Sequence, residues 1–308
     1  MLRLQTHDGP GLRTTVFMKG CSLRCAWCHN PESLSGAQQV WHFPSKCIGC
    51  GACQQACPSG AIAVRPGGLE ILRDRCTGCA RCVAVCPARA MEALRTEWTP
   101  DSLMDLIRRD LAFLSEGGGV TFSGGEPALQ APFVAEVLKR CRAAGLHTAL
   151  DTCGAVDRSA YDQLLPHCNL VLFDLKLADS EAHQRWTGQP NGRILENLRH
   201  VAETAGQRPD LELWVRTPLI PGATATPENV GAAARLLRDL PAGSVSRWEL
   251  CSFNNLCADK YSRLGSPWCF TGEPLLQRSC VSALRQQAAA ESGLQETQVH
   301  LRGRWQDG

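Results

Sequence analysis

Residues 21–28 of the chain are Cys-Ser-Leu-Arg-Cys-Ala-Trp-Cys, three cysteines in the spacing CxxxCxxC. They follow residues 12–20 (LRTTVFMKG), whose β-branched and apolar side chains predict a strand. Three thiolates on one short loop can bind three irons of a cubane iron–sulfur cluster and leave the fourth iron without a protein ligand. An open coordination position is typical of catalytic metal sites. We therefore expect Cys21, Cys25 and Cys28 to hold a catalytic cluster; the alternative is a zinc loop with a distant fourth ligand.

The bulk properties of the chain restrict its class. It has 308 residues, 18 cysteines and a formal net charge of +2, and this charge favours neither nucleic acid nor an anionic membrane as a partner. No run of 18 apolar residues predicts a membrane-spanning helix, and the first eleven residues do not form a signal peptide. We expect a cytoplasmic protein in which clustered cysteines bind metal and do not form disulfides.

Two further cysteine blocks repeat one pattern. Both the block from Cys47 to Pro58 and the block from Cys76 to Pro87 have the spacing CxxCxxCxxxCP of bacterial ferredoxins, in which the fourth cysteine of each block binds the other cluster. Two closed 4Fe-4S clusters for electron transfer are predicted, one on Cys47, Cys50, Cys53 and Cys86 and one on Cys76, Cys79, Cys82 and Cys57. A pair of zinc sites is the alternative. The blocks define a ferredoxin-like insert (residues 45–88) between two parts of a core, residues 1–44 and 89–308.

Seven cysteines lie outside these patterns. Their wide and irregular spacing predicts small buried residues or surface thiols, not a further cluster. They are Cys141, Cys153, Cys168, Cys251, Cys257, Cys269 and Cys280.

Strand and helix patterns alternate after residue 99. A helix is predicted from Thr99 as N-cap and Pro100 as its first residue, with one apolar face through Leu114 and an end at residues 117–119. Strands are expected at 120–123, 147–151, 170–175, 211–217 and 247–253, and helices at 131–144, 159–165, 193–205 and 227–239. With the first strand this gives about six right-handed parallel βα units, an α/β fold with a partial (β/α)6 TIM-like barrel. The tail from residue 273 predicts a helix and then a strand at 297–302.

Polar residues and glycines recur where the predicted strands end. Gly124 and Gly125 follow one strand, Asp151 and Thr152 end the next, Asp174 ends a third, and Arg216 lies in a fourth. The carboxyl ends of parallel strands meet on one face, so these residues are expected beside Cys21. Taken singly, each has an ordinary explanation as a turn glycine, a helix cap or an ion pair such as Lys176 with Asp174.

Two flanking stretches narrow the family. Residues 6–14 (THDGPGLRT) and 28–33 (CHNPES), with Lys260-Tyr261 and Leu264-Gly265 near the end, resemble the glycyl-radical enzyme activating enzymes of the radical S-adenosylmethionine superfamily, in the branch with a two-cluster insert. The resemblance covers almost the whole chain, although residues 266–272 (SPWCFTG) match no pattern. It implies S-adenosylmethionine as cofactor. The residues implied to bind it are Trp27, Gly124, Gly125, Glu126, Asp151, Arg216 and Asn254.

The resemblance also implies a cation site, an activity and partners. A monovalent cation would bind to Asp151, Thr152 and Asp174, with the carbonyl of Leu172 as a further ligand. Asn254 stands where relatives often have a histidine, and an amide cannot titrate near neutral pH. The implied reaction is reductive cleavage of S-adenosylmethionine, after which a 5′-deoxyadenosyl radical removes a hydrogen atom from a glycine of a partner enzyme. Flavodoxin or ferredoxin is the implied reductant, and the protein is expected to be monomeric alone.

Two alternatives remain at this point. A radical S-adenosylmethionine enzyme could act on a small molecule or another peptide, although such enzymes usually carry auxiliary clusters near the C-terminus. A polyferredoxin-like electron carrier would not bind S-adenosylmethionine, and it leaves the CxxxCxxC loop and the strand-end residues without a role.

Overall fold

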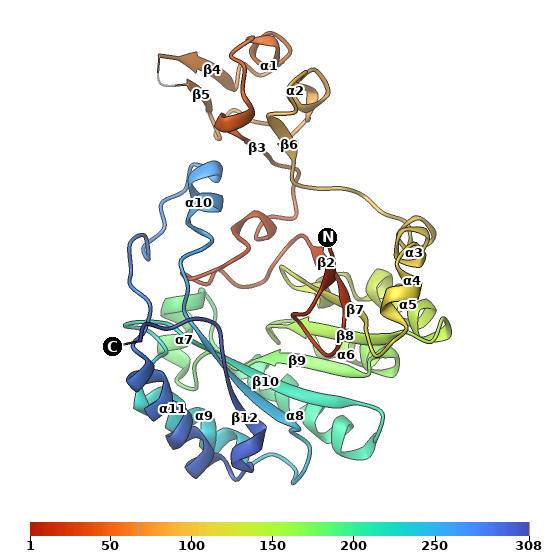
Figure 1. Ribbon diagram of the computed structural model, residues 1–308, viewed down its shortest axis with the longest axis vertical. Coiled ribbons are helices and arrows are strands. Elements are labelled where there is room, and N and C mark those ends of the chain that lie inside the picture. The colour runs from red at the N-terminus through yellow and green to blue at the C-terminus, as the bar shows by residue number, and fades with distance from the viewer. Residues whose placement is uncertain (67, 308) are drawn as a thin grey trace.

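One mixed sheet forms the core of the protein. The computed structural model describes residues 1–66 and 68–307, and its main sheet has the order β1-β2-β7-β8-β9-β10-β11-β12 (Figure 1). The strands are β1 (Leu2–Gln5), β2 (Arg13–Met18), β7 (Gly119–Gly124), β8 (His147–Thr152), β9 (Leu170–Asp174), β10 (Glu212–Leu219), β11 (Arg247–Ser252) and β12 (Val299–Arg302). From β2 to β12 each neighbouring pair is parallel, whereas β1 is an antiparallel edge strand. The six parallel strands of the predicted partial barrel are confirmed, and β12, the predicted tail strand, adds a seventh.

Helices connect and cover these strands. Those of the core are α3 (Pro100–Arg108), α4 (Leu111–Leu114), α5 (Ala131–Ala143), α6 (Arg158–Leu164), α7 (Ser180–Thr187), α8 (Gly192–Gln207), α9 (Pro227–Arg238), α10 (Ala258–Leu264) and α11 (Arg278–Ser292). Short 3-10 turns lie at Pro31–Ser33, Pro44–Lys46, Pro127–Gln130, Leu165–His167 and Glu296–Gln298. Strand side chains such as Phe122, Phe173 and Trp248 pack with helix side chains such as Leu138 and Val230 in one buried cluster. In residues 1–66 and 68–307 no helix has the length and apolarity needed to cross a membrane.

The helix predicted from residue 100 begins as expected but is shorter. The Thr99 side chain accepts a hydrogen bond from the Ser102 amide at 3.2 Å, as an N-cap does. The helix ends at Arg108 and a separate helix, α4, follows, so the prediction of one helix through Leu114 was wrong. Asp110, between the two, is buried and its carboxylate pairs with Arg3 of the edge strand β1. The break in the helix brings this carboxylate to the arginine.

The insert forms a small layer of its own at one end of the molecule (Figure 1). Its elements are β3 (Val40–His42), α1 (Ala52–Gln55), β4 (Ile62–Arg65), β5 (Gly68–Ile71), α2 (Arg81–Ala84) and β6 (Met91–Ala93). Strands β4 and β5 form an antiparallel hairpin, and β3 pairs antiparallel with β6. Because β3 and β6 lie just outside residues 45–88, their pairing brings the two ends of the insert together. Val40, Cys53, Ile62, Cys82 and Met91 form a separate buried cluster there.

Candidate active site

The cysteine loop (residues 20–30) leaves the end of β2 and is held by backbone contacts. The Gly20 amide donates to the Ser33 carbonyl at 2.8 Å, and the Gly20 carbonyl accepts from the Glu126 amide at 2.8 Å. A Cβ atom on Gly125 would lie 2.1 Å from the Gly20 carbonyl oxygen, so only glycine allows this approach. The glycine motif after β7 therefore determines where the cysteine loop begins.

Two helices hold the remainder of the cysteine loop. The amides of Arg24 and Ala26 donate to the carbonyls of Thr187 and Trp186, at the end of α7, at 2.7 and 3.0 Å. The Tyr261 hydroxyl of α10 donates to the Cys28 carbonyl at 2.9 Å. These contacts use backbone groups of the loop and leave its thiols unused.

The three thiols of the loop have different surroundings. Burial raises the pKa of Cys25 to about 11 and that of Cys28 to about 12. A hydrogen bond with the Cys153 thiol lowers the pKa of Cys21 to about 7. Buried thiols become thiolates when a metal cation binds them, so this donor set suits iron.

The thiols of the cysteine loop do not converge on one point. In the described residues no three His, Cys, Asp or Glu side chains lie closely enough to hold one metal ion. A cubane does not need such convergence, because each thiolate binds a different iron.

Trp27 lies in an aromatic cluster next to the cysteine loop. It is 5% exposed, and its ring centroid is 6.1 Å from that of Trp186 in α7. Phe253, Trp268 and Phe270 complete the cluster. The Trp268 indole also donates to the Ala26 carbonyl at 3.1 Å. Residues 266–272, which match no sequence pattern, thus cover the cysteine loop.

The predicted strand-end residues do lie on neighbouring strands at the same level. Met18 of β2 is the register partner of Gly124, and Asp174 of β9 is the register partner of Arg216 in β10. Asp151 of β8 accepts a hydrogen bond from the Ser123 hydroxyl of β7 at 2.7 Å. The structure therefore brings together, on one face, residues that are 198 positions apart in the sequence, from Met18 to Arg216.

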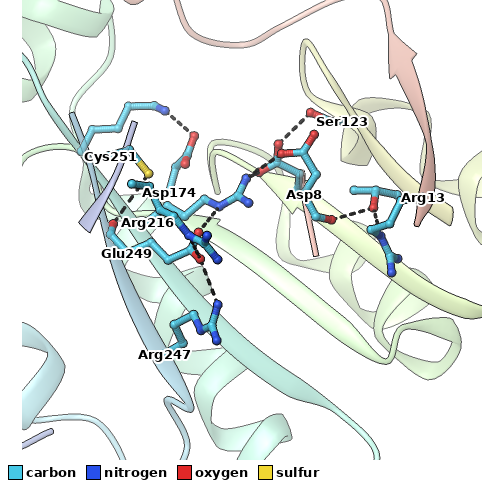
Figure 2. Close-up of polar contacts among 12 residues, drawn as sticks. Asp8, Arg13, Ser123, Asp174, Arg216, Arg247, Glu249 and Cys251 are labelled. Atoms are coloured by element: carbon cyan, nitrogen blue, oxygen red, sulfur yellow. Dashed lines mark hydrogen bonds and ion pairs between the residues drawn. The ribbon is translucent and has the colours of Figure 1, made fainter. Parts of the chain in front are cut away.

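Arg216 is the centre of a charged network inside this face (Figure 2). Its guanidinium nitrogens lie 3.1 Å from a carboxylate oxygen of Asp8, 3.6 Å from Asp151 and 3.1 Å from Glu249. Burial lowers the pKa of Arg216. The charges of the three carboxylates outweigh this effect and raise the pKa above its ordinary value. The ion-pair explanation of Arg216 is thus confirmed, and Asp8 and Glu249 join the site without having been predicted.

The two aspartates differ in their partners. Asp174 pairs with Lys176, as the ordinary explanation of these two residues expected. Burial raises the pKa of Asp151 to about 7; Arg216 opposes this shift, and the nearby charge of Asp174 adds to it. Each aspartate thus faces a basic side chain, Asp174 the ammonium group of Lys176 and Asp151 the guanidinium group of Arg216.

Glu126 and Thr152 are turned toward the protein. The Glu126 carboxylate is fully buried and accepts hydrogen bonds from the Thr152 hydroxyl at 2.8 Å and from the amides of Cys153 and Ala128 at 2.7 and 3.0 Å. The Thr152 hydroxyl also lies 2.7 Å from the Tyr161 hydroxyl. These contacts occupy the Glu126 carboxylate, and its backbone remains part of the glycine turn. Its carboxylate links the turn after β7 to the end of β8.

Asn254 and Leu172 are the last two residues that the sequence placed at the site. Asn254 follows β11, and its side-chain oxygen accepts a hydrogen bond from the Leu256 amide at 3.2 Å. Its backbone also makes a hydrogen bond with the His29 imidazole of the cysteine loop. Leu172 is fully buried in β9 as the register partner of Asp151.

Each set of four insert cysteines lines a cavity. The first, the Cys76 cavity, is lined by Cys57, Cys76, Cys79 and Cys82 together with Val40 and Ile71. The second, the Cys47 cavity, is lined by Cys47, Cys50, Cys53 and Cys86 together with Ile48 and Val64. The crossed grouping is the one that the ferredoxin spacing predicts. Four thiols around one space suit a cubane with all its irons bound by the protein.

The seven other cysteines are mostly buried. Cys141, Cys168 and Cys257 are buried among apolar side chains, whereas Cys269 is exposed and Cys280 partly so. Cys251, on β11, faces Arg216 (Figure 2). Cys153 is buried next to Cys21, so it belongs to the site; only its position directly after Thr152 could have indicated this.

Comparisons with known proteins agree with this site. Residues 73–232 match the model of the Radical SAM superfamily, residues 46–90 that of the 4Fe-4S dicluster domain, and residues 7–61 that of the 4Fe-4S single cluster domain. The chain is 38% identical to the isethionate sulfite-lyase activating enzyme of Desulfovibrio desulfuricans over 85% of this chain and 84% of that protein. It is 37% identical to the (2S)-3-sulfopropanediol dehydratase activating enzyme of Klebsiella oxytoca over 86% and 84% of the two chains.

A solved structure extends the likeness of the fold. SuiB of Streptococcus suis bound to S-adenosylmethionine aligns with a TM-score of 0.56 over 95% of this chain and 51% of SuiB, at 11% identity. This likeness concerns the fold alone. The matches to family models and curated relatives carry the identification: the chain belongs to the radical S-adenosylmethionine superfamily, in its family of glycyl-radical enzyme activating enzymes.

Proposed function

We propose that this chain cleaves S-adenosylmethionine at a cluster held by Cys21, Cys25 and Cys28 and places a radical on a glycine of a partner enzyme. When bound, the cluster and S-adenosylmethionine supply a one-electron cleavage to methionine and a 5′-deoxyadenosyl radical, which takes a hydrogen atom from the glycine α-carbon. The observation that carries the proposal is the common placement of the cysteine loop, Gly124, Asp151 and the pair Asp174–Arg216 at one face of the parallel sheet.

The residues of the chain bind and orient in this scheme. Gly124 has a φ of 110° and Gly125 packs against the Gly20 carbonyl, so the backbone after β7 can approach the methionine part of the cofactor closely. Trp27 supplies an aromatic face for adenine, and Asn254 a polar contact. Asp151 and Arg216 would contact the cofactor from β8 and β10. The Glu126 carboxylate keeps the glycine turn against β8, and its backbone would contact the cofactor with the glycines.

A monovalent cation is part of the proposal. Asp151 and Asp174 supply carboxylate oxygens, and Thr152 and Leu172 add backbone oxygens of the adjacent strands β8 and β9. We assign Thr152 its carbonyl and not its hydroxyl, because the hydroxyl is bonded to Glu126 and Tyr161.

The insert supplies electrons in this scheme. Two closed 4Fe-4S clusters, one in each cavity, bring the number of clusters to three. The electrons come from flavodoxin or ferredoxin in the cytoplasm, a reducing compartment that keeps 18 cysteines available as thiols. The protein acts as a monomer that binds its partner enzyme.

The partner is a glycyl-radical enzyme. Relatives at 36–38% identity are named for activating a sulfite-lyase, a dehydratase and a decarboxylase. Since these partners differ while the identities are nearly equal, a neighbouring gene for a glycyl-radical enzyme is the best guide to the partner of this chain.

Electron paramagnetic resonance tests the proposal. The chain is co-expressed anaerobically with a candidate glycyl-radical enzyme, and the spectrum of the partner is recorded with and without S-adenosylmethionine. We expect the doublet of a glycyl radical only with both present, and no signal with the Cys25→Ala variant. If the wild-type chain cleaves S-adenosylmethionine but no candidate partner gains the doublet, it acts on a small molecule or another peptide and the proposal is wrong.

A further inference from the structure

Cys153, one of the seven cysteines outside the metal-binding patterns, lies directly behind the cysteine loop. It follows Thr152 at the end of β8, and its side chain is buried. Its sulfur lies 3.8 Å from the hydroxyl oxygen of Ser22 and makes a hydrogen bond with the thiol of Cys21. A buried thiol from the sheet thus contacts the first thiol of the loop.

Contacts on both sides fix the backbone of Cys153. Its amide donates to the Glu126 carboxylate at 2.7 Å, and the carbonyl of the next residue, Gly154, accepts a hydrogen bond from the Asn197 side chain of α8 at 2.9 Å. Gly154 has a φ of 78°, and a Cβ atom on it would lie 2.5 Å from the Phe173 ring, so this path of the chain requires glycine. The position of the Cys153 thiol is therefore set by the sheet and α8, independently of the loop.

The sulfur of Cys21 is the acceptor that this thiol has available. The Glu126 carboxylate is also within reach of the Cys153 side chain. However, its oxygens already accept hydrogen bonds from the Thr152 hydroxyl and from the amides of Cys153 and Ala128. A sulfur that binds iron as a thiolate carries negative charge, and a charged acceptor makes the stronger hydrogen bond.

The same contact makes Cys153 a neighbour of a ligand and not a ligand. In a cubane each thiolate binds a different iron, at a different corner. Two sulfurs within a hydrogen bond of each other are too close to occupy two such positions. The contact with Cys21 and burial both raise the pKa of Cys153 well above its ordinary value, so this group keeps its proton and can donate it.

The insert shows that donors to cluster sulfurs recur in this chain. The Ala61 amide donates to the Cys57 sulfur at 3.3 Å, and the Ala90 amide donates to the Cys86 sulfur at 3.2 Å. These donors belong to the backbone of the same cysteine blocks. At Cys21 a side chain from a distant strand contributes a donor, and a side chain can be removed by substitution.

Resting on the function proposed above, we infer that the Cys153 thiol donates a hydrogen bond to the cluster ligand Cys21 and thereby makes the open cluster easier to reduce. Hydrogen bonds to the sulfurs are one determinant of the reduction potential of a cluster. Reduction adds one negative charge, and a donor at a ligand sulfur stabilises the more negative state. The electron comes from the external one-electron reductant, the thiol keeps its proton, and no bond is formed or broken. Cys153 is thus a positioning residue that acts through Cys21.

The midpoint potential of the open cluster tests this role. The full-length holoprotein is titrated anaerobically, and electron paramagnetic resonance follows the signal that changes when S-adenosylmethionine is added and that is missing from Cys25→Ala. Cys153→Ala should disfavour reduction about tenfold, which moves the midpoint potential about 59 mV to more negative values. Cys153→Ser, whose hydroxyl group can still donate, should restore most of this shift. An alanine variant with the wild-type potential, or a serine variant as low as alanine, would overturn the inference.

Cys168→Ala is the matched control. It removes another fully buried thiol, whose partner is the Leu164 carbonyl at 3.3 Å, and should leave the potential unchanged. A shift as large as that of Cys153→Ala would show that loss of buried volume, and not of the hydrogen bond, causes the effect.

Infrared spectroscopy provides a second measurement, on the wild-type protein itself. The S–H stretching band lies apart from the other bands of a protein and moves to lower frequency when the acceptor gains charge. The reduced-minus-oxidised difference spectrum should contain one such shift, which Cys153→Ser removes while the cluster remains. A wild-type difference spectrum without an S–H band would overturn the inference, even if Cys153→Ala loses its cluster.

These measurements are independent of the partner enzyme. A chain with the predicted potentials and S–H shift that never produces a glycyl radical would overturn the proposed function and leave the role of Cys153 in place. A chain that produces the radical, but whose potential does not depend on Cys153, would do the reverse.

Discussion

The cysteine loop and the insert hold their thiols by opposite means. In the insert, four cysteines from two short blocks surround each cavity, within a unit of about 50 residues that has its own small core. In the cysteine loop, three cysteines lie within eight residues, and the groups that fix them come from α7 and α10, about 160 and 230 positions further along the chain. A closed site is organised by its own ligands, whereas an open site needs the remainder of the fold to organise it.

The charges around the two regions differ in the same way. The open site lies beside a buried network in which Arg216 contacts Asp8, Asp151 and Glu249. The insert carries pairs such as Arg65–Glu70, whose side chains are 62% and 51% exposed. Charges at a site that binds a charged cofactor must be buried and oriented in advance. The exposed charges of the insert are screened by solvent.

The largest difference between the two regions is expected when one cysteine is removed from each. Cys25→Ala should abolish cleavage of S-adenosylmethionine, and Cys50→Ala should retain it with a strong artificial reductant. Each variant should keep about two-thirds of its iron, by the ligand count of three cubanes. Iron analysis and the yield of 5′-deoxyadenosine measure the two quantities. Loss of all iron from either variant would contradict the independence of the two regions.

Arg216→Met is expected to have the next largest effect. It leaves the partly buried Asp8 and Asp151 with one cation fewer, whereas Glu249 keeps its ion pairs with Arg247 and Arg302. Loss of the partner of a partly buried carboxylate costs about 1–3 kcal/mol. Anaerobic urea unfolding, followed by tryptophan fluorescence, measures the loss in the free energy of unfolding. The double variant Arg216→Met/Asp151→Asn should recover part of it, since the carboxylate charge that has lost Arg216 is then removed. A single variant as stable as wild type would show that the network is fully solvated.

The sequence predicted the parallel strands and both types of cysteine site because these depend on local patterns. Apolar runs placed β7 to β11 within two residues of their observed bounds, and the cysteine spacings led to the grouping found around the cavities. Thr99 and Pro100 correctly marked the start of α3. Each of these signals is a local sequence pattern, although the crossed grouping joins Cys86 to a block that begins 39 positions earlier.

The missed features depend on contacts between distant residues. Helix α3 ends before Asp110, which pairs with Arg3 of an edge strand that was not predicted. The contacts of the Glu126 carboxylate with Thr152 and Cys153, at the end of the next strand, were not predicted either. Helix α10 has a recognisable sequence, yet its contact with the insert through Arg73 becomes visible only in the folded chain.

At the open site, the affinity for the cofactor is expected to depend on pH through Asp151. Asp151 has a pKa raised to about 7, so its carboxylate is ionised at pH 8 and mostly protonated at pH 6. If the ionised form binds the cation and cofactor, the affinity for S-adenosylmethionine should be about tenfold weaker at pH 6 than at pH 8. Equilibrium binding to the holoprotein measures this, and Asp151→Asn should remove the dependence.

Ser123→Ala provides the control for that titration. The Ser123 hydroxyl donates to the Asp151 carboxylate and so lowers its pKa, and the variant should move the midpoint to higher pH. A rise in pH should strengthen cofactor binding but lower the contribution of Asp151 to the stability of the fold. Between the unfolded and folded pKa values the folded chain retains a proton that the unfolded chain has lost, so the contribution of Asp151 to stability falls as the pH rises through 7. Binding that is equally tight at pH 6 and pH 8 would show that this carboxylate does not take part.

The smallest effect is expected in the insert, at Arg65 of the β4–β5 hairpin. Its ion pair with Glu70 spans 2.6 Å, but both side chains are more than half exposed, and pairs of this kind contribute below about 1 kcal/mol. Arg65→Met should therefore change the free energy of unfolding by less than that, and salt at 0.5 M should abolish even this difference because it screens exposed charges. The same urea experiment as for Arg216 measures it. An Arg65 effect as large as that of Arg216 would mean that the insert, too, depends on charges for its structure, and the contrast between the two regions would then lie in their thiols alone.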